Sequence, residues 1–350
     1  MKKIMLAKEA LQVIWKALCS KLLNKPVIYF FGLATYGNIG DIAIAIASEA
    51  FILQNSKRVL ITINDSVSVR LAKVLRHFVT ENDCVVFQGG GNMGNIYQII
   101  ESERENVFRE FNHTNALQIQ LPSSVNFSAI DEKDEDLNLI YDKVHVFTRE
   151  AASYAEANKL SLGMRYLVPD IVFSLANTMP GLFSNVFKEK DSKIKRILVI
   201  RRQDEERVIS EGFDQLVSSL RVNSDFDVTF TDTVIEVPNL SVRTDEFRKK
   251  LLSAKLSEIE KADIVITDRL HGMILALLSK IPVVAFDNST HKIRSTCQQW
   301  LKDYPNLYFL ESNQSVNVDD LRKWYSSSNQ SRPNLYSDFE QLTNLLKDRN

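Results

Sequence analysis

The chain lacks a long hydrophobic run, an excess of basic residues and a dense set of cysteines. No stretch approaches the ~18 consecutive apolar residues that a membrane-spanning helix requires. Lysine and arginine number 43 against 44 aspartate and glutamate, and this net charge of −1 argues against a nucleic-acid partner. The 3 cysteines are far apart in 350 residues, which favours free thiols in a reducing compartment over a disulfide scaffold.

Several catalytic signatures are absent too. The sequence contains no Gly-x-Ser-x-Gly elbow and no P-loop, which argues against the hydrolases that use them. The spacing of Gly32, Gly37 and Gly40 does not match the Gly-x-Gly-x-x-Gly pattern of a dinucleotide site. No pair of His, Asp or Glu has the spacing of metal ligands, so we predict no metal and no cofactor.

Short apolar runs alternate with helix-favouring segments along most of the chain. Because 350 residues exceed what one hydrophobic core usually supports, we predict α/β structure with two Rossmann-like, doubly wound domains that face a central cleft. The expected strands are 27–31, 58–63, 84–87, 116–121, 144–147 and 165–168 in the first domain, and 197–200, 226–230, 264–266, 283–286 and 307–310 in the second.

The expected boundaries give four parts. An amphipathic helix at 1–24 precedes a first domain at 25–185, and a charged segment leads to a second domain at 195–325. The remaining residues, 326–350, form a tail that ends in a helix.

In the first segment, Leu6, Ile14, Leu18 and Leu22 approximate helical spacing, with Leu11, Trp15 and Leu23 alongside. We expect this helix to dock on the first domain. Contact with a membrane surface is the alternative, which the modest basic bias of its polar face makes less favoured.

Residues 267–273, Thr-Asp-Arg-Leu-His-Gly-Met, carry the strongest functional signal. They lie between an apolar run and a helix-like stretch, and a second apolar run follows, so the unit is a βαβ unit. The turn after the first strand places Arg269 and His271 at a helix N-terminus, where ligands and anions bind in α/β proteins. The alternative is a surface charge and a histidine bonded to a neighbouring loop.

Three other polar segments follow apolar strands in the same way. They are Tyr-Gly-Asn-Ile-Gly-Asp at 36–41, Gln-Gly-Gly-Gly-Asn-Met-Gly at 88–94, and Phe-Thr-Arg-Glu at 147–150. Each could be only a tight turn with a helix cap, and Asn38 or Asp41 suits that role. We predict a glycine-rich loop at 88–94, where the missing side chains let another group pass close.

As a set, these segments resemble the polysaccharide pyruvyltransferase family, enzymes that attach pyruvate from phosphoenolpyruvate to sugars of cell-surface polymers. The residues that carry the resemblance follow the family's order: 37–41, 88–92, 121–124, 148–150, 169–170, 268–272 and Lys292. They span most of the chain, from about Val27 to Lys292. One departure is Asn92-Met93-Gly94-Asn95, where the family pattern has an apolar residue and then an acidic one. The resemblance implies an architecture similar to that of GT-B glycosyltransferases.

The resemblance also implies roles for single residues. His271 is in the position of the family's catalytic histidine, and Asp268 would orient it or hold Arg269, unless it only caps a helix. Because phosphoenolpyruvate carries a carboxylate and a phosphate, its pocket needs cations, preferably arginines. The cationic candidates are Arg269, Arg201, Arg202 and Lys292, and the other predicted substrate contacts are Asn38, Asp41, Gly89, Gly90, Gly91, Asn92 and Arg149. The Arg201–Arg202 pair could instead be a solvated strand end neutralised by Asp204, Glu205 and Glu206.

The expected function is therefore transfer of the enolpyruvyl group of phosphoenolpyruvate to two hydroxyls of a sugar, which forms a pyruvate ketal. The acceptor is a sugar or a lipid-linked oligosaccharide of exopolysaccharide or cell-wall synthesis. Two alternatives remain, a nucleotide-sugar-dependent glycosyltransferase and a non-catalytic sugar- or nucleotide-binding protein in which 89–91 form a phosphate nest. We expect a cytoplasmic location, with the inner face of the plasma membrane as an alternative. Peripheral membrane contact and a homo-oligomer stay open.

Overall fold

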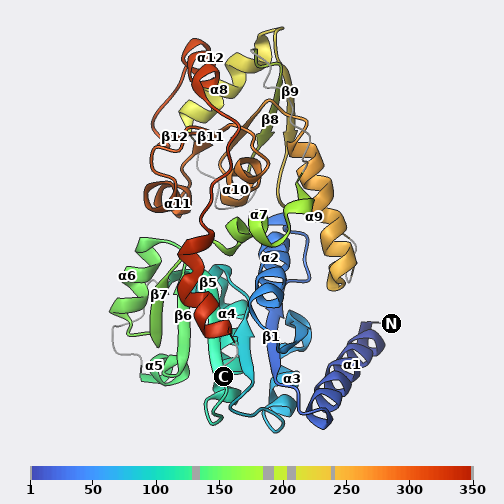
Figure 1. Ribbon diagram of the computed structural model, residues 1–350. Helices are drawn as coiled ribbons and strands as arrows, with labels where there is room; N and C mark the ends of the chain where they lie inside the picture. The colour runs from blue at the N-terminus through green and yellow to red at the C-terminus, as the bar shows by residue number, and fades with distance from the viewer. Residues whose placement is uncertain (1, 128–134, 184–192, 203–209, 238–240, 348–350) are drawn as a thin grey trace.

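The computed structural model describes residues 2–127, 135–183, 193–202, 210–237 and 241–347. In this part of the chain, two sheets, all of whose strand pairs are parallel, form the centres of two lobes (Figure 1). The first lobe runs from blue to green in the figure and the second from yellow to orange-red, and the red C-terminal segment returns to the first lobe. The prediction of an α/β protein with two Rossmann-like sheets is confirmed.

The first sheet has the order β2-β1-β3-β5-β6-β7, and a seventh described strand, β4, pairs with β5. Its strands are β1 (Val27–Leu33), β2 (Val59–Asn64), β3 (Cys84–Phe87), β4 (Gly90–Gly94), β5 (Leu117–Asn126), β6 (Val144–Thr148) and β7 (Met164–Leu167). The strand order reverses between β1 and β3, and the carboxyl ends beside such a switch point are where open α/β sheets bind ligands.

Side chains of the first sheet alternate between two cores because successive strand residues point to opposite faces. In β1, Ile28 and Phe30 enter the core between the lobes, whereas Tyr29 and Phe31 enter the outer core. Helices that contribute to the outer core are α1 (Lys2–Leu22), α3 (Ser68–Leu75), α4 (Gln98–Phe111), α5 (Glu135–Tyr141) and α6 (Ala151–Lys159). On the inner face lie α2 (Ile39–Asn55), α7 (Leu175–Thr178) and α13 (Glu340–Leu346).

The second sheet has the order β12-β11-β10-β8-β9. Its strands are β8 (Arg196–Ile200), β9 (Asp227–Thr231), β10 (Ile264–Thr267), β11 (Val283–Phe286) and β12 (Leu307–Leu310). Helices α8 (Glu211–Val222) and α12 (Val318–Ser327) cover its outer face, and α9 (Asp245–Ile259), α10 (Leu270–Leu278) and α11 (Lys292–Trp300) cover the face toward the first lobe. Here the switch point lies between β8 and β10, so the segments after these strands should meet a ligand.

The two lobes share one continuous apolar core. Residues of α2 in the first lobe and of α9 and α10 in the second belong to the same buried cluster. The loops before α2 and after β9 also pair as extended backbone: Ile39 N donates to Thr233 O at 2.8 Å, and Ile235 N donates to Gly37 O at 2.8 Å. The chain then returns to the first lobe, where Phe339 packs on Phe51 with ring centroids 5.4 Å apart. Burial on this scale favours a fixed arrangement of the lobes.

The prediction of a loop at 88–94 is wrong for its second half, which forms β4 parallel to β5. Glycine often indicates a turn, but here it lets β4 approach β5 closely. A Cβ on Gly94, at φ +119°, would lie 1.8 Å from Asn126 O. Glycine disfavours strands in general, and tertiary pairing overrides that preference at this position.

Helix α1 docks on the first lobe, as predicted, but with a face that differs in part from the predicted one. Val13 and Ala17 are buried in the outer core, whereas Leu11, Trp15, Leu22 and Leu23 are exposed. The helix contacts β2 and α3, and Leu6 and Ile14 of the predicted face are partly buried against the same core. None of the described helices is long and apolar enough to cross a bilayer. The boundary near 185–195 involves residues 184–192, which lie outside the described residues, and it stays a prediction.

Candidate functional site

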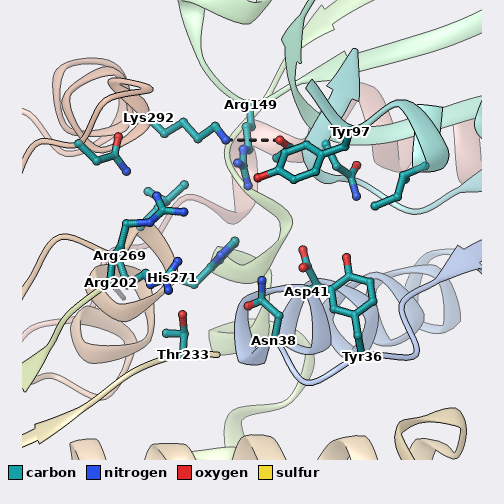
Figure 2. A pocket seen from close by; sticks show the side chains of 15 residues that line it. Tyr36, Asn38, Asp41, Tyr97, Arg149, Arg202, Thr233, Arg269, His271 and Lys292 are labelled. Atoms are coloured by element: carbon teal, nitrogen blue, oxygen red, sulfur yellow. Dashed lines mark hydrogen bonds between the residues drawn. The ribbon is translucent and has the colours of Figure 1, made fainter. Parts of the chain in front are cut away.

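A cavity of about 310 Å³ lies between the lobes, at the carboxyl ends of strands from both sheets. Nine of the predicted site residues line it: Asn38, Asp41, Gly91, Asn92, Arg149, Arg202, Arg269, His271 and Lys292. Their labelled side chains surround a common space in Figure 2, with Lys292 and Arg149 at one end and Asn38 and Asp41 facing His271. The interpretation of several strand-end segments as parts of one site is thus supported by their placement.

Three helices begin at this cavity. Asn38 is the N-cap of α2, Arg269 is the N-cap of α10, and Lys292 is the first residue of α11. Helix N-termini carry partial positive charge and free N–H groups, so each favours an anion. In the described lining, Arg149, Arg202, Arg269 and Lys292 add four cationic side chains against one carboxylate, Asp41. The cavity therefore suits a ligand with more than one negative charge.

His271 belongs to a buried network with Asp170 and Arg149. Its Nε2 lies 3.3 Å from Asp170 Oδ2, and Arg149 Nη1 donates to the same oxygen at 2.6 Å. Burial opposes the charged form of Asp170, but His271 and Arg149 outweigh it and lower the pKa of this carboxyl. The network comes from β10–α10, the end of β6 and the segment after β7, so it fixes the imidazole across the two lobes.

Asp41 faces the network from the first turn of α2. Burial raises the pKa of its carboxyl, although the charge of His271 and a hydrogen bond with Tyr36 act in the opposite direction. Gly40 beside it carries no side chain, and a Cβ there would lie 2.3 Å from His271 Nδ1. Glycine at position 40 thus allows α2 to approach the imidazole.

Arg269 forms a planar pair with Asp232. Its Nε and Nη2 each donate to one oxygen of that carboxylate at 2.8 Å, while the side chain also lines the cavity. Two parallel bonds of this kind hold a guanidinium in one orientation. Asp232 follows β9 and received no role from the sequence.

Asp268 does not have the predicted geometry. Its Oδ1 accepts from Arg202 N at 2.8 Å and, among the described residues, Asp170 is the carboxylate hydrogen-bonded to the imidazole. Asp268 is also not the N-cap of α10, which is Arg269. Burial raises the pKa of Asp268, and the nearby positive charges oppose that shift. Its carboxylate therefore positions the strand end that carries Arg202.

Three predicted substrate residues lie outside the cavity lining. Arg201 forms an ion pair with Asp214 at 2.5 Å, and its guanidinium lies over the Phe213 ring. Consecutive residues after a strand point in opposite directions, so only Arg202 of this pair reaches the cavity. Gly89 lies against the backbone of Pro122, and Gly90 lies near Asp41. Asp204, Glu205 and Glu206 lie outside the described residues.

Residues outside the cavity hold two of its lining residues, Asn92 and Arg149, in place through hydrogen bonds. Arg104, fully buried, donates from Nη2 to Asn92 Oδ1 at 2.7 Å and pairs with Glu101, which also accepts from Gly94 N at 2.7 Å. Across the lobes, Trp300 Nε1 donates to Arg149 O at 2.8 Å. These bonds set the positions of the Asn92 and Arg149 backbones.

Six further lining residues received no role from the sequence: Tyr36, Tyr97, Ile100, Thr233, Leu270 and Asn288. Tyr36 and Leu270 adjoin predicted motifs, and Asn288 follows a predicted strand, so their positions relative to the strand ends were a usable signal. Thr233 and Tyr97 reach the cavity through tertiary placement alone. Within the described residues, no cluster of three or more His, Cys, Asp or Glu side chains is arranged for a metal ion.

Comparison with known proteins identifies the family. The model of the family described as polysaccharide pyruvyl transferase matches residues 38–290, which contain all the cavity-lining residues except Tyr36 and Lys292. The chain belongs to this family. The resemblance inferred from the sequence motifs is confirmed, and it places the protein among transferases of polysaccharide synthesis.

Relatives of the polysaccharide pyruvyl transferase chain extend over most of its length. General stress protein 30 of Bacillus subtilis is 30% identical over 330 residues, which cover 93% of each chain. Pyruvyl transferase 1 of Schizosaccharomyces pombe is 26% identical over 288 residues, covering 78% of this chain and 69% of the relative. The fold is shared with UDP-GlcNAc 2-epimerase from Neisseria meningitidis, with a TM-score of 0.51, 12% identity and coverage of 92% and 99%.

Proposed function

We propose that the protein transfers the pyruvyl group of phosphoenolpyruvate to two hydroxyls of one sugar and thereby forms a cyclic pyruvate ketal. The observation that supports this most directly is the convergence of four cationic side chains and three helix N-termini on one imidazole. Phosphoenolpyruvate carries a phosphate and a carboxylate beside a carbon–carbon double bond that must be protonated. A site for it therefore needs both the cations and a proton donor.

Arg269, Arg202, Arg149 and Lys292 bind the two anionic groups of the donor. Arginine suits this role because its planar fork matches carboxylate and phosphate oxygens. Asp232 holds the Arg269 fork in place, and Asp170 does the same for Arg149. Neither Asp268 nor Arg201 contacts the donor in this proposal.

His271 provides the proton. An imidazole exchanges protons near neutral pH, as a general acid and base must. In the geometry described here Nε2 is next to Asp170 and Nδ1 faces Gly40 of α2, and the ring lines the donor cavity. Asp170 acts through His271 and is a positioning residue.

The proposed reaction balances as follows. A proton adds to the methylene carbon, which becomes the methyl group, and the oxygen of one sugar hydroxyl bonds to the central carbon. The second hydroxyl oxygen then bonds to the same carbon as the carbon–oxygen bond to phosphate breaks. Of the two hydroxyl protons, one balances the new methyl hydrogen and the other leaves with phosphate. Asn38 and Asp41 are the proposed contacts to the two reacting hydroxyls.

The proposal is tested by phosphate release from phosphoenolpyruvate in the presence of saccharide acceptors. Release that depends on an acceptor, with a product heavier by one pyruvylidene group, is the expected result. A parallel reaction with nucleotide sugars tests the glycosyltransferase alternative. Nucleotide-sugar turnover without use of phosphoenolpyruvate would overturn the proposal.

The donor also bears on location. Phosphoenolpyruvate is made in the cytosol, so the proposed reaction takes place in the cytoplasm, and a lipid-linked acceptor would bring the protein to the inner face of the membrane. Cell fractionation tests this: the protein should be in the cytosolic fraction or be released from membranes by high salt. Retention in membranes after an alkaline wash would contradict it.

A further inference from the structure

A second cavity of about 420 Å³ adjoins the first one. The two cavities share Gly91, Tyr97 and Lys292, which form the wall between them. The second cavity is lined from both lobes, by Asn126 and Glu150 of the first and by Thr290 and Ser295 of the second. Its volume is within the range of about 300–1,000 Å³ typical of small-molecule sites.

The two cavities differ in charge. In the first, four cationic side chains face one carboxylate, whereas in the described lining of the second, Lys159 and Lys292 face Glu150 and Glu156. The remaining polar groups of the second cavity are hydroxyls and amides. A dianionic donor is therefore favoured in the first cavity, and an uncharged ligand rich in hydroxyl groups fits the second.

Glu150 is the residue that selects such a ligand. It is 3% exposed, and Ser153 Oγ donates to its Oε1 at 2.7 Å. Its Oε2 is buried without a hydrogen-bond partner and lies 3.4 Å from Arg149 Nε in an ion pair. The Glu150 carboxylate lines the cavity and accepts one hydroxyl donor, Ser153, among the described residues, so a ligand hydroxyl that donates to it adds a charge-assisted hydrogen bond. The backbone at Glu150 is extended, so the side chains of Arg149 and Glu150 point in opposite directions. Arg149 therefore lines the first cavity, and Glu150 lines the second.

The shared wall allows contact between the two ligands. Gly91 has no side chain there, and a Cβ would lie 3.0 Å from Lys292 Nζ and 3.2 Å from Arg149 Nη2. Tyr97 and Ile96, which are 39% and 52% exposed, add apolar surface beside the opening. The C–H face of a pyranose ring can pack on such a surface while its hydroxyls reach polar groups around it.

We propose that this second cavity binds the saccharide acceptor, with the Glu150 carboxylate accepting a hydrogen bond from one of its hydroxyls and Tyr97 beside its ring. The inference rests on the proposed function, since it assumes that the first cavity holds phosphoenolpyruvate. The hydroxyl pair of the bound sugar then extends past Gly91 toward the donor. Glu150 contacts the acceptor and not the donor.

Two variants address the proposal from opposite lobes. Glu150→Gln keeps the shape but removes the charged acceptor, and Ser295→Trp adds bulk to the cavity from α11 while leaving the Arg149 and Glu150 side chains in the sequence. Ser219→Trp, on an exposed face of α8 outside both cavities, is the matched control for bulk. Circular dichroism and thermal melts establish that each variant is folded.

The probes are a panel of methyl hexopyranosides and N-acetylhexosamine glycosides, measured by saturation-transfer NMR, and phosphoenolpyruvate, measured by calorimetry. We expect both variants to weaken glycoside binding by about ten- to a hundredfold, as for loss of one hydrogen bond to a charged group. Phosphoenolpyruvate affinity should stay within about twofold of wild type, because the arginines of the first cavity are intact.

Each outcome decides one part. Glycoside binding that is unchanged in both variants, or absent in the wild type, overturns the acceptor site. Parallel loss of phosphoenolpyruvate and glycoside affinity in Glu150→Gln, with Ser295→Trp unaffected, also overturns it, because Glu150 would then only position Arg149. A wild type that binds glycosides in the second cavity but neither binds nor consumes phosphoenolpyruvate would leave the saccharide site standing and overturn the proposed function.

Discussion

The Asp170 carboxylate holds two candidate functional side chains at once, because His271 and Arg149 share its Oδ2. If His271 donates the proton, His271→Gln should lower turnover by about 10²- to 10⁴-fold, since an amide cannot act as an acid. Donor affinity should change little, because the arginines provide it. Acceptor-dependent phosphate release and phosphoenolpyruvate binding, measured separately, check this prediction.

His291→Gln is the control, since His291 is exposed and pairs with Asp287 outside the cavity lining. A slow His291 variant beside a normal His271 variant would contradict the assignment.

Arg269 and Arg201 offer a matched pair of arginines. Arg269→Lys keeps the charge but loses the fork to Asp232, so we expect phosphoenolpyruvate affinity to fall by about tenfold or more. Arg201→Lys should stay close to wild type, because Arg201 pairs with Asp214 away from the cavity. Calorimetric titration with phosphoenolpyruvate measures both. Equal affinities in the two variants would remove Arg269 from the donor site.

Glu103 on α4 gives a prediction about pH and stability. Burial raises its pKa from 4.5 to about 7, and a hydrogen bond with Ser68 opposes this only in part. The folded state keeps the proton to higher pH than the unfolded state does, so Glu103 reduces stability as pH rises from about 4.5 to 7. We expect Glu103→Gln to gain stability relative to wild type across this window and to keep that gain above it. Urea unfolding at several pH values measures the difference, with Glu110→Gln as the control. A difference that is independent of pH would show that burial does not shift this carboxyl.

Sequence reasoning grouped most residues of the candidate site because it relied on strand ends. Segments 36–41, 147–150 and 267–273 all follow strands of parallel sheets, whose carboxyl ends gather at one edge, so their convergence followed from topology. The partners of the site residues were not accessible in this way. Asp170 lies 101 positions from His271, and Asp232 lies 37 from Arg269. The first pair depends on how the two lobes meet and the second on the strand order within the second sheet, and no local pattern records either.

At the scale of elements, β4 and α1 show why two local interpretations needed correction. The run of glycines at 88–94 predicts a loop. In the structure, the close approach of residues 90–94 to β5 requires glycine within a strand. In α1 the buried face combines Val13 and Ala17 with the partly buried Leu6 and Ile14, so the larger apolar residues identified it only in part. In both cases the packing against a neighbouring element determines the structure: the strand conformation of β4 and the buried face of α1. The intrinsic preference of the segment does not.

The docked face of α1 can be tested by two substitutions on the same helix. Val13 is 5% exposed in the outer core and Leu11 is 67% exposed. We expect Val13→Ala to lower the free energy of unfolding by about 1–3 kcal/mol, from lost burial and a residual cavity. Leu11→Ala should change it by no more than about 0.5 kcal/mol. Urea denaturation followed by circular dichroism measures both. A larger loss in Leu11→Ala would mean that the helix docks through its other face.

At the scale of the whole molecule, the site depends on the lobes keeping one arrangement. The donor cations come from both lobes, with Arg149 on the first and Arg202, Arg269 and Lys292 on the second. The shared core and the buried pair of Arg248 and Glu49, at 2.8 Å, join the lobes directly. A large apolar interface of this kind makes independent domain motion costly. The same interface that forms the cavity should therefore also couple the folding of the two lobes.

Coupled folding predicts that damage confined to one lobe is felt in the other. Ile63 is fully buried in the outer core of the first lobe, and Ile63→Val should cost about 0.5–1.5 kcal/mol. If the lobes unfold together, the slowest-exchanging amides of β8 and β10 should exchange roughly two- to tenfold faster, matching those of β1 and β3, because all of them open only in global unfolding. Hydrogen exchange followed by mass spectrometry measures both sets in one sample. Leu53→Val, at a position that is 62% exposed on α2, is the control and should leave both sets unchanged. Faster exchange in β1 and β3 with unchanged β8 and β10 would show that the second lobe stays folded when the first one opens, and that the shared core does not bind them into one cooperative unit.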